Sequence, residues 1–120
     1  MQRIRKVTKE GKDIMVFDFS GMENTEDIVD LANKCTERCK KDEPKSRLSV
    51  TYIKDMHFNQ TVGDAMKKFA SEAEPTSRMA VVAGAEGLQK VMLKAVEKFS
   101  NRNFKVYDTL DEAIEYLAKV

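Results

Sequence analysis

The sequence predicts a single α/β domain in which an N-terminal β-hairpin is followed by repeated β-α units, giving a mostly parallel five-stranded sheet with four helices. Three observations predict this class. Short apolar runs of strand character alternate with segments whose apolar residues recur every three or four positions. The turns between them are short, so right-handed crossovers should connect parallel strands. Finally, 120 residues without an internal repeat or linker suit one core.

The chain begins with the predicted hairpin. Residues 4–8 and 13–20 have strand character, and the turn residues Glu10, Gly11 and Lys12 separate them. Residues 14–19 are apolar at nearly every position, with Asp18 as the exception. We therefore expect this second strand to be covered on most of both faces.

A first helix is predicted near residues 25–40, with Asn24 as its N-cap. The following strand, residues 48–53, alternates apolar and hydroxyl side chains, so one of its faces is expected to be partly wet. The apolar stripe of the helix includes both cysteines of the chain and consists of Ile28, Leu31, Ala32, Cys35 and Cys39.

A second helix is predicted near residues 61–73, where Thr61 opens a pattern like a capping box and Pro75 follows the end. Residues 79–83 are wholly apolar and are the best candidate for a central parallel strand. A third helix follows the turn at residues 84–87. It has the most regular apolar stripe of the chain, which we assign to the core: Leu88, Val91, Met92, Ala95, Val96 and Phe99.

The last β-α unit is predicted at the C-terminal end. Asn101 and Asn103 supply turn chemistry before a strand at residues 104–107. Thr109 and Glu112 then form the Thr-x-x-Glu pattern of a capping box. The helix that follows is expected to bury Leu110, Ala113, Ile114 and Leu117.

Composition and charge exclude several functional classes. The chain has 21 Lys+Arg against 20 Asp+Glu, whereas dedicated nucleic-acid binders normally have a strong basic excess. No apolar run approaches the roughly 20 residues that cross a bilayer, so we expect no stable membrane insertion. The N-terminus lacks the apolar region of a secretion signal, which favours a cytoplasmic location. There Cys35 and Cys39 are expected to be reduced core residues rather than metal ligands.

Candidate functional residues are expected at one edge of the sheet. In a parallel α/β sheet, ligands bind where the carboxyl ends of the strands meet the following helices. His57, the only histidine, lies in one of these loops and has a role as a base or ligand only if Asp55 orients it. The polar residues predicted at this edge are Asp18, Ser20, Asp55, His57, Glu86 and Asp108.

The turn from Gly84 to Lys90 places two glycines and a lysine at a helix N-terminus, where backbone N–H groups can receive an anion. The segment lacks the spacing of a P-loop or of a dinucleotide-binding turn, and Glu86 would repel a phosphate. A tight strand-to-helix turn is the favoured interpretation.

No pattern in the sequence indicates an enzyme. No serine stands in a nucleophile elbow, and a single histidine excludes a site with a pair of histidine ligands. We therefore predict no catalytic residues, no metal site and no cofactor.

Three segments resemble the C-terminal half of the small SpoIIAA-like proteins of the STAS superfamily. They are residues 78–90 (RMAVVAGAEGLQK), residues 95–102 and residues 105–117 (KVYDTLDEAIEYL). The resemblance implies a four-turn β-α superhelix with helices largely on one face of the sheet. It also implies kinship with anti-sigma-factor antagonists and with CRAL-TRIO-type lipid-binding domains. The antagonists carry a phosphorylatable serine at the start of the second helix, and residues 55–63 of this chain have none. Thr61 is the nearest hydroxyl, and helix capping is its simpler role.

The predicted function is that of a non-enzymatic binding or regulatory module that acts through a protein partner or through self-association as a homodimer. Its binding surface would be the less covered face of the sheet or the loops at the strand ends. An alternative is a carrier for a small apolar or lipid-like ligand, with a pocket lined by Met56, Phe58, Met66 and Phe69. Nucleotide or anion binding at the Gly84–Lys90 turn is a third possibility. The candidate binding residues are Asp55, His57, Phe58, Thr61, Gly84, Glu86, Gly87 and Lys90.

Overall fold

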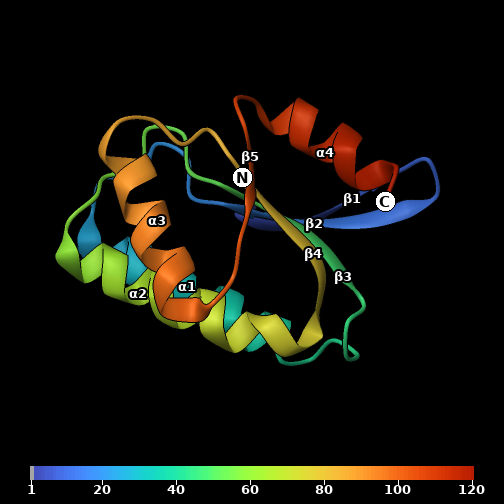
Figure 1. Ribbon diagram of the computed structural model, residues 1–120, viewed down its shortest axis with the longest axis horizontal. Coiled ribbons are helices and arrows are strands. Elements are labelled where there is room, and N and C mark those ends of the chain that lie inside the picture. The colour runs from blue at the N-terminus through green and yellow to red at the C-terminus, as the bar shows by residue number, and fades with distance from the viewer. Residues whose placement is uncertain (1) are drawn as a thin grey trace.

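A five-stranded mixed sheet forms the centre of the protein in the computed structural model, which describes residues 2–120 (Figure 1). Strands β1 and β2 pair antiparallel, and β2 to β5 pair parallel in chain order. The predicted hairpin and the mostly parallel sheet are therefore confirmed. The strands are β1 (Ile4–Lys9), β2 (Lys12–Asp18), β3 (Arg47–Tyr52), β4 (Ser77–Ala83) and β5 (Lys105–Tyr107).

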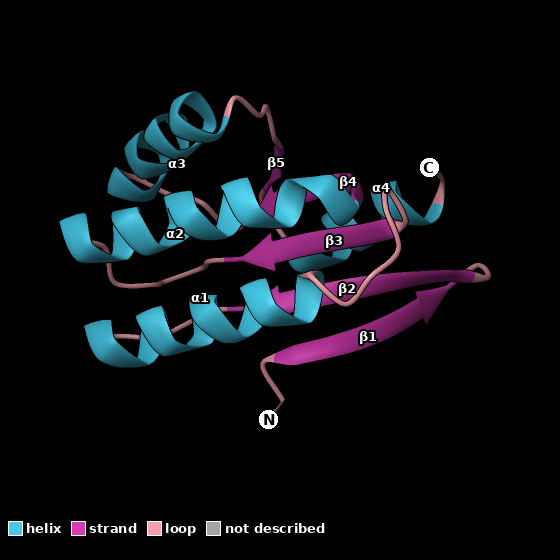
Figure 2. Cartoon of the chain, turned by 90° about the horizontal axis from the view of Figure 1, so that it is seen from below, coloured by secondary structure: helices cyan, strands magenta, loops and turns pink. Residues whose placement is uncertain are grey.

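Residues 2–120 form four α-helices, the number predicted, and these cover both faces of the sheet. Helices α1, α2 and α3 lie on one face, and α4 lies on the other (Figure 1, Figure 2). The helices are α1 (Thr25–Cys39), α2 (Gln60–Ala73), α3 (Leu88–Ser100) and α4 (Leu110–Ala118), and a 3₁₀ turn at Glu74–Thr76 follows α2.

Strand β2 is buried on both faces. Met15 and Phe17 pack in the core under α1, α2 and α3, whereas Ile14 and Val16 pack against α4. Successive side chains of a strand point to opposite faces, so a strand between two helical layers must be apolar throughout. The continuous apolar run therefore predicted its environment correctly.

The second face of the sheet is covered, contrary to the expectation of an open face. Val50 and Val81 point to this face and are 0% and 1% exposed. The reason is α4, which starts directly after β5 and packs Leu117 and its neighbours across the strands. A binding surface must therefore be sought elsewhere than on the sheet.

Two of the predicted helix caps are confirmed. Asn24 Oδ1 accepts a hydrogen bond from the Asp27 N–H at 3.0 Å at the start of α1. At the start of α4, Thr109 Oγ1 accepts from the Glu112 N–H at 3.2 Å and donates to Glu112 Oε1 at 3.0 Å. Each cap satisfies a backbone donor that the first turn of a helix leaves unpaired.

Helix α2 has a different cap from the one predicted. It begins at Gln60, and Asn59 rather than Thr61 is its N-cap. Asn59 Oδ1 accepts from the Val62 N–H at 2.9 Å, and Asn59 Nδ2 donates to Thr25 Oγ1 at 2.9 Å. Asparagine caps a helix at least as well as threonine, and here its amide also connects the starts of α1 and α2. Thr61 lies exposed in the first turn.

Candidate functional site

An open hollow of about 630 Å³ lies beyond the carboxyl ends of β3 and β4. The loops after these two strands form its walls, because neighbouring parallel strands end at the same edge of the sheet. The hollow brings together several predicted candidates, namely Asp55, His57, Phe58, Glu86 and Gly87. Its full lining is Asp55, Met56, His57, Phe58, Glu86, Gly87, Leu88 and Gln89.

The buried side chain of Gln89 holds the two walls of the hollow together. Its Nε2 donates to the carbonyl groups of Ile53 and Met56, at 2.8 Å each. Its Oε1 accepts from the Glu86 N–H at 2.9 Å. Gln89 was not among the predicted candidates. The only signal in the sequence is a polar residue within the apolar periodicity of α3, and such a residue must find partners when it is buried.

His57 contacts Asn59 rather than Asp55. The His57 ring is exposed, and its Nε2 lies 3.4 Å from Asn59 Nδ2. The His57 N–H donates to the Met22 carbonyl at 2.8 Å, which fixes the loop on the turn before α1. A role of His57 as a base or ligand was expected only if Asp55 oriented the ring. Among the described residues, no hydrogen bond joins the two side chains, so this condition is not met.

Gly84 is buried at the end of β4 and does not line the hollow. Its φ is +80°, and a Cβ at this position would lie 2.9 Å from both the Cβ and the backbone N of Lys54. Only glycine fits such a close approach in this conformation. The candidates Thr61 and Lys90 are exposed on α2 and α3 and also lie outside the lining.

The turn at residues 84–87 satisfies much of its own hydrogen-bonding capacity. The Glu86 N–H donates to Gln89 Oε1, the Gln89 N–H to the Glu86 carbonyl, and the Lys90 N–H to the Gly87 carbonyl. These donors are engaged within the protein. The geometry favours a tight strand-to-helix turn over an anion site.

Asp18, at the end of β2, is a buried carboxylate that forms a partly exposed ion network with the N-terminal strand. Arg5 Nη1 donates to Asp18 Oδ2 at 2.9 Å, and the Ser20 hydroxyl donates to Asp18 Oδ1 at 2.6 Å. Burial by itself raises the pKa of this carboxyl, but the hydrogen bonds from Ser20 and Arg5 outweigh it and hold the pKa below its ordinary value. The network ties β1 to the sheet rather than forming part of the hollow.

We expect Asp18→Asn to lower the free energy of unfolding by about 1.5–3 kcal/mol at pH 7, since it removes hydrogen bonds to a charged acceptor. Because the folded-state pKa is depressed, this contribution is complete above the unfolded pKa, about pH 4, and is lost as the pH falls through the lower folded value. Urea unfolding of both proteins between pH 7 and pH 3 measures it.

The matched control is Asp13→Asn, because both contacts of the Asp13 side chain are exposed, an ion pair with Lys6 at 3.9 Å and a hydrogen bond from the Thr8 hydroxyl at 2.9 Å. Its cost should stay below about 0.5 kcal/mol. Equal costs for the two variants, or a difference for Asp18 that does not shrink toward pH 3, would contradict the assigned network.

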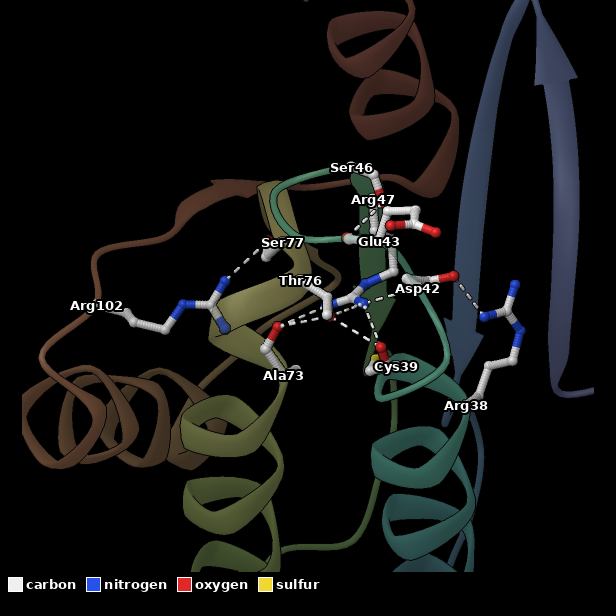
Figure 3. A network of polar contacts seen from close by, with 10 residues as sticks. All are labelled: Arg38, Cys39, Asp42, Glu43, Ser46, Arg47, Ala73, Thr76, Ser77 and Arg102. Carbon is white, nitrogen blue, oxygen red and sulfur yellow. Dashed lines mark hydrogen bonds and ion pairs between the residues drawn. The ribbon is translucent and has the colours of Figure 1, made fainter.

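Arg47, at the start of β3, is the centre of a second buried network, shown in Figure 3. Its side chain is 4% exposed. Its Nη1 donates to Asp42 Oδ2 at 2.9 Å and to Thr76 Oγ1 at 2.6 Å, and its Nη2 donates to the Ala73 carbonyl at 2.7 Å. The Cys39 carbonyl, 3.4 Å from Nη1, completes the set. The guanidinium thus lies at the C-terminal ends of α1 and α2, where a cation is favourable.

Asp42 is the counter-charge of this network. It also accepts from Arg38 Nη1 at 2.7 Å. Burial alone raises the pKa of Asp42, and the hydrogen bonds from Arg38 and Arg47 more than compensate and hold that pKa below its ordinary value. Arg38 and Arg47 lie within five residues of Asp42, but the contacts of Arg47 with Thr76 and the Ala73 carbonyl have no signal in the sequence, because they form only when the end of α2 meets the start of β3.

A small apolar cavity of about 50 Å³ lies between β3, β4, α2 and α3. Met66 and Phe69 line it, whereas Met56 and Phe58, predicted for the same pocket, line the hollow instead. Ser49, expected on a partly wet face, is 4% exposed and also lines the cavity. The volume corresponds to about three or four water molecules and is far below the roughly 300–1,000 Å³ of typical ligand pockets.

The outer face of α3 is apolar and exposed. Leu88, Val91 and Phe99 are 69%, 64% and 63% exposed, and Ala95 between them is also exposed. Their spacing of three or four residues places them on one side of the helix, which we call the α3 row. The assignment of this stripe to the core is therefore wrong for these four residues. The helix is buried instead through Gln89, Met92, Leu93 and Val96.

Cys35 and Cys39 lie in the core, as predicted. Both are 0% exposed, and burial raises the pKa of both thiols, that of Cys39 to about 11. Among residues 2–120, no three His, Cys, Asp or Glu side chains are grouped so that they could hold a metal ion. Over the same residues, no helix combines the length and the apolar character needed to span a bilayer.

Comparison with known proteins identifies one family. A model of the SpoIIAA-like family matches residues 14–118. No curated protein and no solved structure matches the chain. The match runs from β2 to the end of α4 and includes the hollow and the α3 row. The resemblance seen in residues 78–117 is thereby confirmed and extends upstream.

Proposed function

The chain belongs to the SpoIIAA-like family, and from this premise we propose that it is a non-enzymatic, STAS-like binding module that works in the cytoplasm through a protein partner. One observation carries the proposal, the exposed α3 row of Leu88, Val91, Ala95 and Phe99. Single apolar side chains on a surface need no explanation, but an aligned set on one helix face is typical of an interaction site.

The hollow supports the same proposal. Leu88 is both the first residue of the α3 row and part of the lining of the hollow, so the two features form one surface. The central polar side chain there, Gln89, is already engaged by three backbone groups. This role in holding two loops favours a binding surface over a catalytic centre.

The test is photo-crosslinking in the native cell with benzoylphenylalanine in place of Val91. The expected result is an adduct with another protein, because Val91 lies at the centre of the α3 row and is 64% exposed. Mass spectrometry of the adduct distinguishes a different protein from a second copy of this chain.

The control places the same crosslinker at Asn33, which is exposed on α1. An adduct from Val91 that is absent from Asn33 supports the proposal. Equal adducts from both positions, or none from Val91, would overturn it.

A second candidate function, binding of an apolar ligand of only a few heavy atoms, is supported by the lining of the cavity between the sheet and α2, whereas its volume of about 50 Å³ is too small for a lipid. Arg47 and Arg102 line it together with apolar side chains, and Arg47 Nε is buried with no hydrogen-bond partner among the described residues. A small ligand with one acceptor group would suit this lining. Native mass spectrometry of the purified protein tests it, and a mass equal to that of the bare chain counts against it.

A further inference from the structure

We propose that the α3 row binds an amphipathic helix of the partner, whose apolar face is bordered by acidic residues. This inference rests on the proposed function and adds the shape and charge of the segment that binds. Three observations support it, namely the geometry of the row, the charges beside it and the arrangement of these charges under twofold symmetry.

The geometry favours a helix as the bound segment. The row runs over residues 88–99 of a 13-residue helix, about 16 Å at 1.5 Å per residue. Side chains three and four residues apart form a ridge that fits the groove of a second helix. An extended strand would need unpaired backbone groups to bind, and the interior of a helix offers none.

The charge beside the row favours an acidic partner. Lys90, Lys94 and Lys98 are all exposed and four residues apart, so they form a line along α3. At about 100° per residue, this line lies roughly 100° around the helix from the α3 row. Within residues 2–120, none of the three lysines makes an ion pair. Acidic residues on a bound helix would complement them.

The acidic residues close to α3 do not pair with these three lysines. Glu97 is engaged by the Phe104 N–H, which donates to its Oε2 at 2.7 Å. Glu86 and Asp55 lie at the hollow, beside the Leu88 end of the row. At the opposite end, Lys67 of α2 lies over the Phe99 ring, 5.8 Å from its centroid, and its charge is paired with Asp64 at 3.8 Å.

The same charges disfavour a second copy as the occupant. In an antiparallel twofold pair of α3 helices, each flank meets the same flank of the other helix, so the two lysine lines would face each other. In a parallel pair, the lysines would meet the α2 side, where Lys67 lies beside Phe99. Like charges across an interface are unfavourable in the antiparallel arrangement, and in the parallel one the lysines would meet no unpaired acidic group at this position, since Asp64 already pairs with Lys67.

Synthetic helical peptides of about 16 residues, long enough to cover the row from Leu88 to Phe99, test the inference. One carries leucines on one face with glutamates on both borders, and its counterpart has lysine in place of every glutamate. Binding to the purified protein is followed by backbone amide shifts. We expect the acidic peptide to bind at residues 88–99 about tenfold more tightly than the basic one, and more weakly as salt is raised.

The test variant is K90E/K94E/K98E, and its matched control is K34E/K41E/K119E. Both change the net charge by the same amount, but the control changes exposed lysines away from α3. The first should abolish the preference for the acidic peptide, and the second should preserve it. Equal binding of both peptides, shifts outside residues 88–99, a concentration-dependent dimer, or binding to anionic phospholipid vesicles in place of the peptide would overturn the inference.

The two proposals fail separately. A protein adduct from Val91 without binding of the acidic peptide leaves the binding module standing and removes the acidic helix as its partner. Absence of the adduct removes both.

Discussion

Replacing Arg47 by methionine is expected to lower the free energy of unfolding by about 3–4 kcal/mol, the largest effect of any single substitution considered for this protein. Methionine fills a similar volume but donates no hydrogen bond. The buried Ala73 carbonyl would lose its 2.7 Å partner, and the partly buried Asp42 carboxylate would lose its 2.9 Å partner. Urea unfolding at pH 7 measures the loss as a lower midpoint with an unchanged slope.

Two further variants show whether the stability depends on the charge of Arg47, on the geometry of its hydrogen bonds, or only on any arginine beside Asp42. Arg47→Lys keeps the charge but cannot reach helix ends on both sides with a planar fork, so an intermediate loss is expected. Arg38→Met removes the other ion partner of Asp42. Because the Arg38 side chain is 38% exposed, the loss of unfolding free energy should stay below about 1 kcal/mol. A loss below 1 kcal/mol for Arg47→Met, or a loss as large for Arg38→Met, would contradict the central role of Arg47.

Gln89→Leu is expected to lower the free energy of unfolding by about 2–3 kcal/mol. The Met56 carbonyl and the Glu86 N–H would lose their partners, while the Ile53 carbonyl keeps a bond from the Met56 N–H at 3.1 Å. Leucine is of similar size, so the loss reflects unpaired groups rather than a cavity.

The loss at Gln89 should also loosen the hollow. Hydrogen exchange should become faster in residues 53–59 and 84–87 and remain unchanged in the strands. The control is Gln60→Leu at an exposed position of α2, for which a change within about 0.5 kcal/mol is expected. Unchanged exchange in both loops of Gln89→Leu would show that Gln89 does not hold the hollow together.

The edge of the sheet that carries the hollow could be predicted from the sequence, but the contacts within it could not. Strand-like runs ending near Tyr52 and Ala83 are sufficient to place the following loops side by side, because parallel strands share an edge. The pairing of Gln89 with Ile53, 36 residues earlier, depends on how α3 is rotated above that edge. The apolar periodicity of the sequence does not predict how α3 is rotated about its own axis.

Helix α3 illustrates the same limit. The recurrence of apolar residues correctly predicted a helix, but the sequence has apolar side chains on two adjacent faces. One contains Met92 and Val96, and the other contains Val91 and Phe99. Only packing against α2 decides which of them is buried, and that packing leaves the second face exposed.

The sequence by itself determined the α/β class, the order of the elements, two of the helix caps and the family, because each depends on local spacing or a contiguous motif. The tertiary structure alone decided that α4 covers the second face of the sheet, that Arg47 joins two helix ends, and that the α3 row is exposed. The physical reason is common to all three. Burial and pairing depend on which surfaces meet in space, and residues far apart in the chain supply those surfaces.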